Sequence, residues 1–260
     1  MKHHARKRFG QNFLHDESVI ARIIASLKPA SGDTVIEVGP GLGALTLPLL
    51  EHVDHLQVVE IDRDLIARLA ALQRSNLQIH EGDVLDMQWQ TLSTGKPLRI
   101  VGNLPYNIGT PLLIELLNVH PLVRDIHVML QKEVVDRLHA ASGTRAYGRL
   151  SVMMQSVFDI TPLFTVPPES FDPMPKVHSA VVRLKTRDDA LSAEQLSSLQ
   201  QTTRLAFAAK RKTLRNNFKG HLNEQQLQAI EIDPQARAET LSLDDFIRLA
   251  KALVSCNRQT

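Results

Sequence analysis

The chain has 260 residues, of which 43% are hydrophobic, enough for one substantial core and a smaller second one. Its formal net charge is only +2, from 30 basic and 28 acidic residues, so the total charge neither requires nor excludes a polyanionic partner. The single cysteine, Cys256, excludes an intramolecular disulfide framework and a cysteine-rich zinc site. The sequence contains no signal-peptide pattern and no apolar run of about 18 residues, so we expect a cytoplasmic protein with no membrane attachment.

The N-terminal segment is basic and precedes the first predicted helix. Lys2, Arg6, Lys7 and Arg8 form a basic cluster, and the stretch KRFGQNFLHD, which begins at Lys7, mixes polar and apolar side chains. The pattern ESVIARIIASL predicts a helix over residues 17–27, with Asp16 as its N-cap.

Short apolar runs rich in β-branched residues then alternate with helix-period segments. This alternation is typical of an α/β domain with a mostly parallel sheet. The helix over 44–53 should begin at Ala44 or Leu45, because Pro48 is tolerated only in a first turn. The next helix, over 62–74, opens on acids and closes on Arg74, as the helix dipole favours. The predicted strands cover residues 34–38, 56–61, 76–82, 97–102, 125–130 and 178–186.

The pattern changes after about residue 186. Strand signals stop, and residues 192–254 read as helices with a break around Pro234. The sequence therefore predicts an α/β domain over residues 1–188 and a small all-helical domain over residues 189–260.

Three glycines and two acids follow the first three predicted strands. VIEVGPGLGALTL places Gly39, Gly41 and Gly43 between a strand and a helix, where the backbone can approach a ligand closely. A tight turn with no ligand is the alternative. Glu60 closes the second strand and can bind both hydroxyls of a ribose, and Asp83 follows the third. The spacing G-x-G-x-G is not that of a dinucleotide fingerprint, and no lysine follows as in a triphosphate-binding loop.

The stretch NLPY, at the end of the fourth predicted strand, combines an amide, a proline and an aromatic ring. The Asn103 amide oxygen and the Leu104 carbonyl can accept the two N–H groups of an amine, such as the exocyclic amine of adenine, and Pro105 fixes the direction of that carbonyl. Tyr106 can stack on the flipped-out base. Phe171 lies in a proline-rich loop, predicted to be neither helix nor ladder, and can supply a second stacking face. Ordinary loop and core packing is the alternative for both rings.

These motifs resemble a known family. VIEVGPGLG, VVEID and EGDVLD look like the class I S-adenosylmethionine-dependent methyltransferases, and NLPY looks like the signature of enzymes that methylate amino groups. Enzymes that methylate the side-chain amide of glutamine have a similar motif with two prolines. In this chain, Leu104 stands in place of the first of these prolines. With KRFGQNFL, SFDPMPKVHSAVVRL and KRKTLRNNF, nearly the whole chain resembles the ribosomal RNA adenine dimethyltransferases, most of all those of the bacterial small subunit.

The resemblance implies a Rossmann-like class I sheet with a small C-terminal all-helical domain. It implies S-adenosylmethionine as methyl donor and S-adenosylhomocysteine as product. The implied acceptor is N6 of two adjacent adenines in the 3′-terminal hairpin loop of 16S rRNA in the assembling small ribosomal subunit, with the enzyme a monomer. The implied cofactor contacts are Asn12, Leu14, Gly39, Glu60, Asp83 and Asn103, with Glu37 a weaker candidate near the cofactor's amino group. The implied catalytic residues are Asn103, Leu104, Tyr106 and Phe171. Asp172 and Met174 depart from the pattern expected in many relatives.

The segment from Thr203 to Gly220 contains six basic residues and no acid. On one continuous helix, Phe207, Leu214 and Phe218 would form a core stripe, and Arg211, Arg215 and Lys219 would lie on a neighbouring exposed strip. An ordinary solvated helix face is the alternative. We expect this face to bind RNA phosphates through Arg211, Lys212, Arg215 and Lys219.

No metal site is expected, because His52, Asp54 and His55 stand at a helix end without a fourth ligand. Two other functions stay open at this point. One is the large-subunit adenine methylation of macrolide resistance, against which KRKTLRNN and the long helical tail argue. The other is a non-catalytic RNA-binding assembly or transcription factor, which the intact Glu60, Asp83, Asn103, Pro105 and Tyr106 disfavour.

Overall fold

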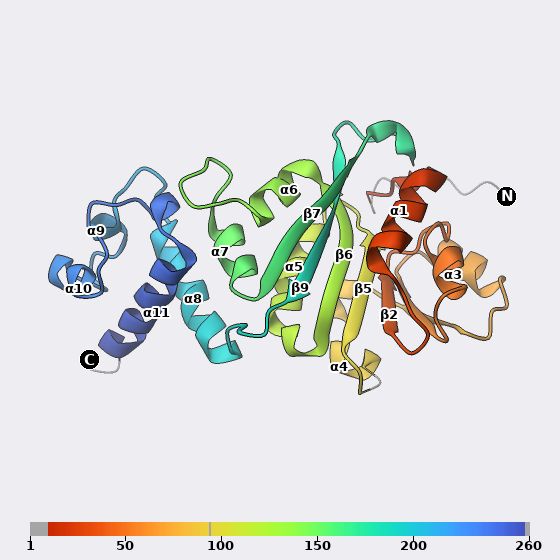
Figure 1. Cartoon of the computed structure of the whole chain (residues 1–260), viewed down its shortest axis with the longest axis horizontal. Coiled ribbons are helices and arrows are strands. Elements are labelled where there is room, and N and C mark those ends of the chain that lie inside the picture. Colours follow the sequence, from red (N-terminus) through yellow and green to blue (C-terminus); the bar gives the residue numbers. More distant parts are fainter. Residues whose placement is uncertain (1–9, 94, 258–260) are drawn as a thin grey trace. The chain divides into compact units, whose positions relative to one another are not determined.

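A seven-stranded sheet forms the centre of the first part of the chain (Figure 1). The computed structural model describes residues 10–93 and 95–257, so the basic cluster of Lys2, Arg6, Lys7 and Arg8 lies outside the described residues. The strand order is β4-β3-β2-β5-β6-β9-β7. The strands are β2 (Thr34–Val38), β3 (Leu56–Glu60), β4 (Leu77–Glu81), β5 (Leu98–Asn103), β6 (Val123–Gln131), β7 (Phe158–Val166) and β9 (Ser179–Thr186).

The sheet is mostly parallel, as predicted. Strands β2 to β6 pair in parallel, and β9 pairs antiparallel with β6. The chain builds outward from β2 through β3 to β4 and then returns to the other side of β2 with β5. The order therefore reverses between β2 and β5, and the carboxyl ends of these two strands are where ligands bind in such sheets.

Three strands were not predicted. Strand β7 contains Pro162 and few buried side chains, which weakens the strand pattern. The other two, β1 (Phe13–Leu14) and β8 (Phe171–Asp172), form a separate antiparallel pair. The prediction that the proline-rich loop is neither helix nor ladder was wrong. Pro168 opens a 3₁₀ turn, η4 (Pro168–Ser170), where its missing N–H is not needed, and Asp172 is extended because Pro173 follows it.

The helices around the sheet begin largely where their capping residues predict. Helix α1 (Glu17–Leu27) is capped by Asp16, which accepts hydrogen bonds from the backbone N–H groups of Ser18 and Val19. Helix α2 (Thr46–Leu50) keeps Pro48 in its first turn. Helix α3 (Arg63–Ala70) ends four residues before the predicted Arg74, since Gln73 takes a left-handed conformation. Figure 1 shows α1 in front of the sheet and α5 behind it. The remaining helices here are α4 (Trp89–Leu92) and α5 (Gly109–Asn118).

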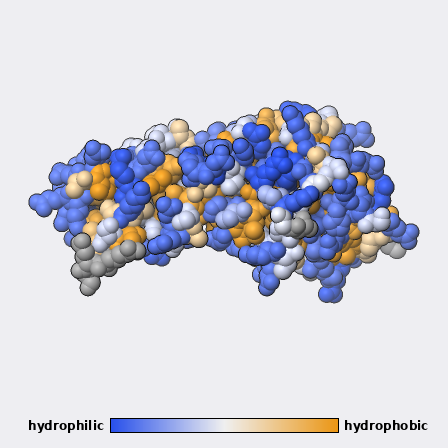
Figure 2. All heavy atoms as spheres, turned by 60° about the horizontal axis from the view of Figure 1, so that its bottom comes forward, coloured by the Kyte–Doolittle hydropathy of each residue, from blue (hydrophilic) through white to orange (hydrophobic). Residues whose placement is uncertain are grey.

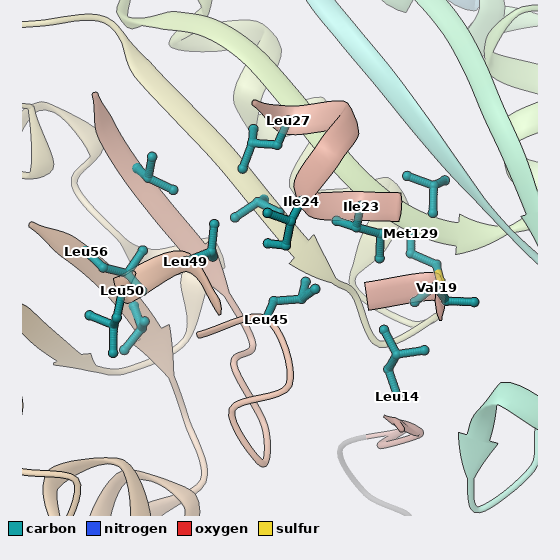
Figure 3. Close-up of a cluster of buried hydrophobic side chains, with 14 of the residues drawn as sticks. Leu14, Val19, Ile23, Ile24, Leu27, Leu45, Leu49, Leu50, Leu56 and Met129 are labelled. Carbon is teal, nitrogen blue, oxygen red and sulfur yellow. The ribbon is translucent and has the colours of Figure 1, made fainter. Parts of the chain in front are cut away.

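One buried cluster joins α1 to the sheet and to the segment that enters α2. Val19, Ile23 and Ile24 of α1 pack in it, as Figure 3 shows, together with Leu45 and Met129. Leu14 and Phe171, which are paired across β1 and β8, belong to the same cluster. Burial of these side chains, at roughly 1.5–3 kcal/mol each, fixes the elements that surround the end of β2.

The second compact unit is helical. Of the residues that the structure describes, it contains 136–159 and 187–257, whereas the sequence predicted a boundary at residue 188. The difference arises because α7 packs against α8, where the Thr203 hydroxyl donates to the Met153 sulfur at 3.7 Å. Its helices, with the connecting α6, are α6 (Lys132–Leu138), α7 (Arg149–Gln155), α8 (Ala193–Ala206), α9 (Leu214–Asn217), α10 (Glu224–Ala229) and α11 (Leu243–Asn257).

Hydrophilic residues cover most of the face drawn in Figure 2, and hydrophobic atoms come to it in small patches. Among the described residues, no helix has the length and hydropathy of a membrane span. In the same part of the chain, the exposed large hydrophobic side chains are Leu47, Ile61, Leu72, Ile114, Met174 and Val177.

Candidate active site

One pocket brings together all the cofactor-binding and catalytic residues that the sequence predicted. It opens at the carboxyl ends of β2, β3 and β5, which is the point where the strand order reverses. The segment 10–14 and Phe171 complete its lining. The predicted residues in the lining are Asn12, Leu14, Gly39, Glu60, Asp83, Asn103, Leu104, Tyr106 and Phe171.

The carboxyl and basic groups of the pocket's described lining are all of one kind, because every one is an acid. Glu37, Glu60 and Asp83 line it, and no lysine, arginine or histidine is among the described residues of its lining. Such a pocket favours a cation and disfavours the pyrophosphate of a dinucleotide. A sulfonium cofactor with an α-ammonium group fits this requirement.

The glycine loop has backbone conformations that suit glycine. Gly39, Gly41 and Gly43 have φ values of 66°, 58° and 89°. A Cβ on Gly41 would lie only 3.2 Å from the Phe13 ring. The loop therefore brings its backbone close to β1 and to the pocket, as the glycine spacing predicted.

Glu60 is held by three backbone N–H groups. Its Oε1 accepts hydrogen bonds from Ile61 and Asp62 at 2.9 Å, and its Oε2 accepts one from Gly41 at 3.3 Å. Burial raises its pKa, and these hydrogen bonds oppose that rise. The carboxylate thus links the end of β3 to the glycine loop in a fixed orientation.

Asp83 follows β4 and is half-buried. Its Oδ1 accepts from the Leu85 N–H at 3.0 Å, which caps the short turn η2 (Val84–Asp86). The cap fixes the carboxylate at the rim of the pocket, beside the end of β4.

Glu37 is the most deeply buried acid of the pocket. It is 2% exposed at the end of β2, and the Thr46 hydroxyl donates to its Oε2 at 2.7 Å. Burial raises the pKa of Glu37 to about 8, and the nearby Glu60 adds to the rise. The sequence named Glu37 only as a weaker candidate, and its partner Thr46 was missed because nothing in a helical pattern marks a hydroxyl that faces a strand end.

The Asn103 side chain has a defined orientation. Its amide nitrogen donates to the Asn12 carbonyl at 2.9 Å, which leaves Oδ1 as the amide's acceptor. The backbone of the next residues turns into α5, where the Pro105 carbonyl accepts from Ile108 and Gly109. In the described part of the chain, neither Asn103 Oδ1 nor the Leu104 carbonyl accepts a hydrogen bond. Two acceptors are therefore available where β5 ends.

Two aromatic rings line the pocket near these acceptors. The Tyr106 hydroxyl is hydrogen-bonded to the buried Ser179 hydroxyl at 2.8 Å, across 73 positions of sequence. Phe171 is 3% exposed and packs into the core cluster as well as lining the pocket. Phe171 thus belongs both to the hydrophobic core and to the wall of the pocket. The sequence pattern does not predict the contact between Tyr106 and Ser179, because a hydroxyl inside a strand of β-branched residues carries no local signal.

The predicted basic strip is not one helical face. Helix α8 ends at Ala206, and Arg211 and Lys212 lie in the turn before α9. Asn217 closes this break by donating to the Ala206 carbonyl at 2.6 Å. Arg215 forms an ion pair with Glu224 at 3.1 Å, so an acid does reach this group in space. The four predicted residues Arg211, Lys212, Arg215 and Lys219 are nonetheless all exposed.

The three residues considered as metal ligands have separate partners. His52 Nδ1 is 2.8 Å from the Pro48 carbonyl, Ser31 donates to Asp54 at 2.7 Å, and His55 Nε2 is 3.0 Å from Gln78. Each of the three side chains thus has a hydrogen-bond partner of its own.

The doubly wound sheet, the acidic pocket at its switch point and the Asn-Leu-Pro-Tyr turn define a class I S-adenosylmethionine-dependent methyltransferase. The sequence model described as "Ribosomal RNA adenine dimethylase" matches residues 2–255. The chain therefore belongs to the ribosomal RNA adenine dimethylase family.

Individual relatives agree with this assignment. "Ribosomal RNA small subunit methyltransferase A" of Laribacter hongkongensis is 52% identical over 251 residues, covering 96% of each chain. A solved dimethyladenosine transferase from Plasmodium falciparum is 26% identical with a TM-score of 0.82, over 94% of this chain and 98% of that one. The solved 23S rRNA methyltransferase ErmE is 25% identical with a TM-score of 0.72, over 94% of this chain and 100% of that one. The predicted fold class is confirmed.

Proposed function

We propose that the chain transfers methyl groups from S-adenosylmethionine to N6 of two adjacent adenines in the 3′-terminal hairpin loop of 16S rRNA. The product is N6,N6-dimethyladenosine, and the substrate is the assembling small ribosomal subunit. Family membership and the printed name of the 52% identical relative support small-subunit rRNA over the large-subunit rRNA of ErmE. The observation that carries the proposal is the pair of acceptors, Asn103 Oδ1 and the Leu104 carbonyl, beside an acidic pocket.

The residues of the pocket fit the cofactor. Glu60 would accept hydrogen bonds from the ribose hydroxyls, and Asp83 would read the adenine. Gly39 and Asn12 would approach the methionine end, with Glu37 near its ammonium group. When bound, this cofactor supplies an electrophilic methyl group on a positively charged sulfur.

The clamp at the end of β5 would prepare the acceptor. The lone pair of an adenine N6 amine is delocalised into the ring, which makes the amine a poor nucleophile. Hydrogen bonds from both of its N–H groups to Asn103 Oδ1 and Leu104 O would hold the nitrogen in line with the donor and favour its pyramidal form. Tyr106 and Phe171 would hold the extruded base by stacking.

The proton of the amine needs no strong base in the pocket. The nitrogen becomes acidic once the methyl group has arrived, so the proton can then leave to water. This agrees with a described lining in which asparagine and backbone carbonyl groups, and no histidine, surround the acceptor position.

Exposed cations of the helical unit would hold the RNA backbone. Arg211 and Lys212 lie in an exposed turn, and Lys219 follows α9. Phosphate contacts of this kind position the RNA without reading its sequence.

The Asn103→Ala variant tests this proposal. Removal of one of the two acceptors should lower kcat about 10²–10³-fold, as the loss of one preorganised transition-state hydrogen bond does in other enzymes. The measurement is transfer of labelled methyl groups to small-subunit rRNA at saturating cofactor, since Asn103 also contacts the cofactor pocket. The matched control is Asn118→Ala, which truncates an exposed asparagine at the end of α5. Normal turnover of the Asn103 variant would refute the clamp.

A further inference from the structure

A hydrogen bond links two segments of the pocket wall that are far apart in sequence. The Ser170 hydroxyl donates to Asp16 Oδ2 at 2.9 Å, across 154 positions. Ser170 immediately precedes Phe171, and Asp16 follows the pocket-lining segment 10–14 by two residues. The bond therefore joins the ends of the two segments that carry the predicted stacking ring and the predicted cofactor contacts Asn12 and Leu14.

The backbone reinforces the same junction. Leu14 pairs with Phe171 in the two-stranded sheet of β1 and β8, and the His15 N–H donates to the Ser170 carbonyl at 3.0 Å. Ser170 is only 2% exposed, so its hydroxyl has little access to water. A buried hydroxyl bonded to a carboxylate makes a charge-assisted bond, which is stronger than one between neutral groups.

Asp16 is itself held in place by α1. Its Oδ1 accepts from the backbone N–H groups of Ser18 and Val19 at 3.0 and 3.2 Å, and from the Ser18 hydroxyl at 2.7 Å. The hydrogen bonds from Ser18 and Ser170 lower the pKa of Asp16, so it is a carboxylate at neutral pH. One oxygen thus caps a helix that is packed into the core, and the other is directed at Ser170.

Short strands need such support. Each strand of the β1–β8 pair has two residues, too few to be stable without further contacts. The loop after Phe171 is exposed at Asp172, Pro173 and Met174. The Asp16–Ser170 bond therefore acts together with the core packing of Phe171: it fixes the residue before the ring at the point where this loop leaves the core.

We propose that Asp16 and Ser170 are positioning residues, which set the orientation of Phe171 toward the target adenine and tie it to the cofactor side of the pocket through β1. The inference rests on the proposed function in one respect, the stacking of Phe171 on the base.

Ser170→Ala is the central variant. A misplacement of about 1 Å can cost about 10²-fold in rate, so kcat/KM for rRNA should fall roughly 10- to 100-fold, while the cofactor Kd measured calorimetrically stays within about twofold. Asp16→Asn is the conservative variant, because asparagine caps helices as well as aspartate and its amide can still bond Ser170. It should retain most of the activity. Ser18→Ala removes the other hydroxyl partner of Asp16 and should leave transfer unchanged.

A structural readout separates positioning from general destabilisation. In an rRNA hairpin with 2-aminopurine at the target adenine, stacking on an aromatic ring quenches the fluorescence of the flipped base. The Ser170→Ala complex should be quenched less than the wild-type complex at equal RNA saturation. Wild-type quenching and kcat/KM in this variant would overturn the inference.

Phe171→Leu distinguishes failure of the inference from failure of the proposed function. Leucine keeps an apolar side chain in the core cluster but removes the ring. Loss of transfer in Phe171→Leu with normal transfer in Ser170→Ala would overturn the positioning role alone. Normal transfer in Phe171→Leu would refute the stacking role, and with it the inference.

Discussion

At the scale of single residues, the pocket contains a carboxyl group that burial keeps protonated. Glu37 is 2% exposed, and its described hydrogen-bond donor is the Thr46 hydroxyl. Its pKa is raised to about 8, from an ordinary value of 4.5. The free protein therefore holds a neutral acid at the position where the proposal expects the ammonium group of the cofactor, and arrival of that cation would favour ionisation.

This raised pKa predicts a pH dependence of stability. The folded state retains the Glu37 proton where the unfolded chain loses it, so the stabilisation is complete below pH 4.5 and is lost as pH rises toward 8. Glu37→Gln keeps a neutral acceptor for Thr46 and removes this loss. In cofactor-free protein, the variant should exceed the wild type in unfolding free energy at pH 8, by on the order of a few kcal/mol, and much less at pH 5.

Urea unfolding at several pH values measures this difference. The control is Glu81→Gln at the end of β4, whose side chain is 54% exposed and should leave the pH profile as it is. Parallel stability profiles for wild type and Glu37→Gln would contradict the buried, protonated state.

At the scale of elements, the connection between α8 and α9 places the basic residues Arg211 and Lys212 in a turn and not on a helix. The spacing of Arg211, Arg215 and Lys219 predicted a strip on one helix, but the chain leaves the helix at Phe207, whose ring stacks on Phe246 at 5.6 Å. That contact and the Asn217–Ala206 hydrogen bond are tertiary, so the local pattern could not reveal them. The exposure of the cations was predictable, and their arrangement was not.

This arrangement changes what each cation should contribute to RNA binding. Arg211 has no acidic partner among the described residues, whereas Arg215 is paired with Glu224. A plot of log K against log salt has a negative slope. In Arg211→Ala this slope should become shallower by about 0.7–0.9, as expected when one phosphate contact is lost, and binding at low salt should weaken. Arg215→Ala should have a smaller effect, because part of its charge is already neutralised.

Filter binding of a small-subunit rRNA fragment at several salt concentrations measures both slopes. Arg74→Ala, which removes an exposed arginine paired with Glu51 in the first unit, is the matched control. If the slope for Arg211→Ala equals that of the wild type, Arg211 does not bind an RNA phosphate, and the turn is an ordinary solvated surface.

At the scale of the whole molecule, the sequence predicted the sheet and the pocket better than the boundaries. The runs that became β2 to β6 and β9 are apolar and β-branched, and the glycines and acids at their ends came together as the parallel topology requires. Strands β1, β7 and β8 were not predicted, since two-residue strands and a proline-containing edge strand show almost no alternation of hydrophobic and polar residues. The roles of Ser170, Ser179 and Thr46 were not predicted. Their hydrogen bonds join residues that are far apart in sequence or that lie in different elements. Residues 136–159 joined the helical unit through the packing of α7, which no local pattern records.

The most direct test of the central claim is the product formed on rRNA. Purified protein, labelled S-adenosylmethionine and small ribosomal subunits that lack this methylation are incubated, and the digested RNA is analysed by mass spectrometry. We predict N6,N6-dimethyladenosine at two adjacent adenines of the 3′-terminal hairpin loop. Label on a glutamine side chain or on large-subunit rRNA alone, or no label in RNA although the cofactor binds, would contradict the account.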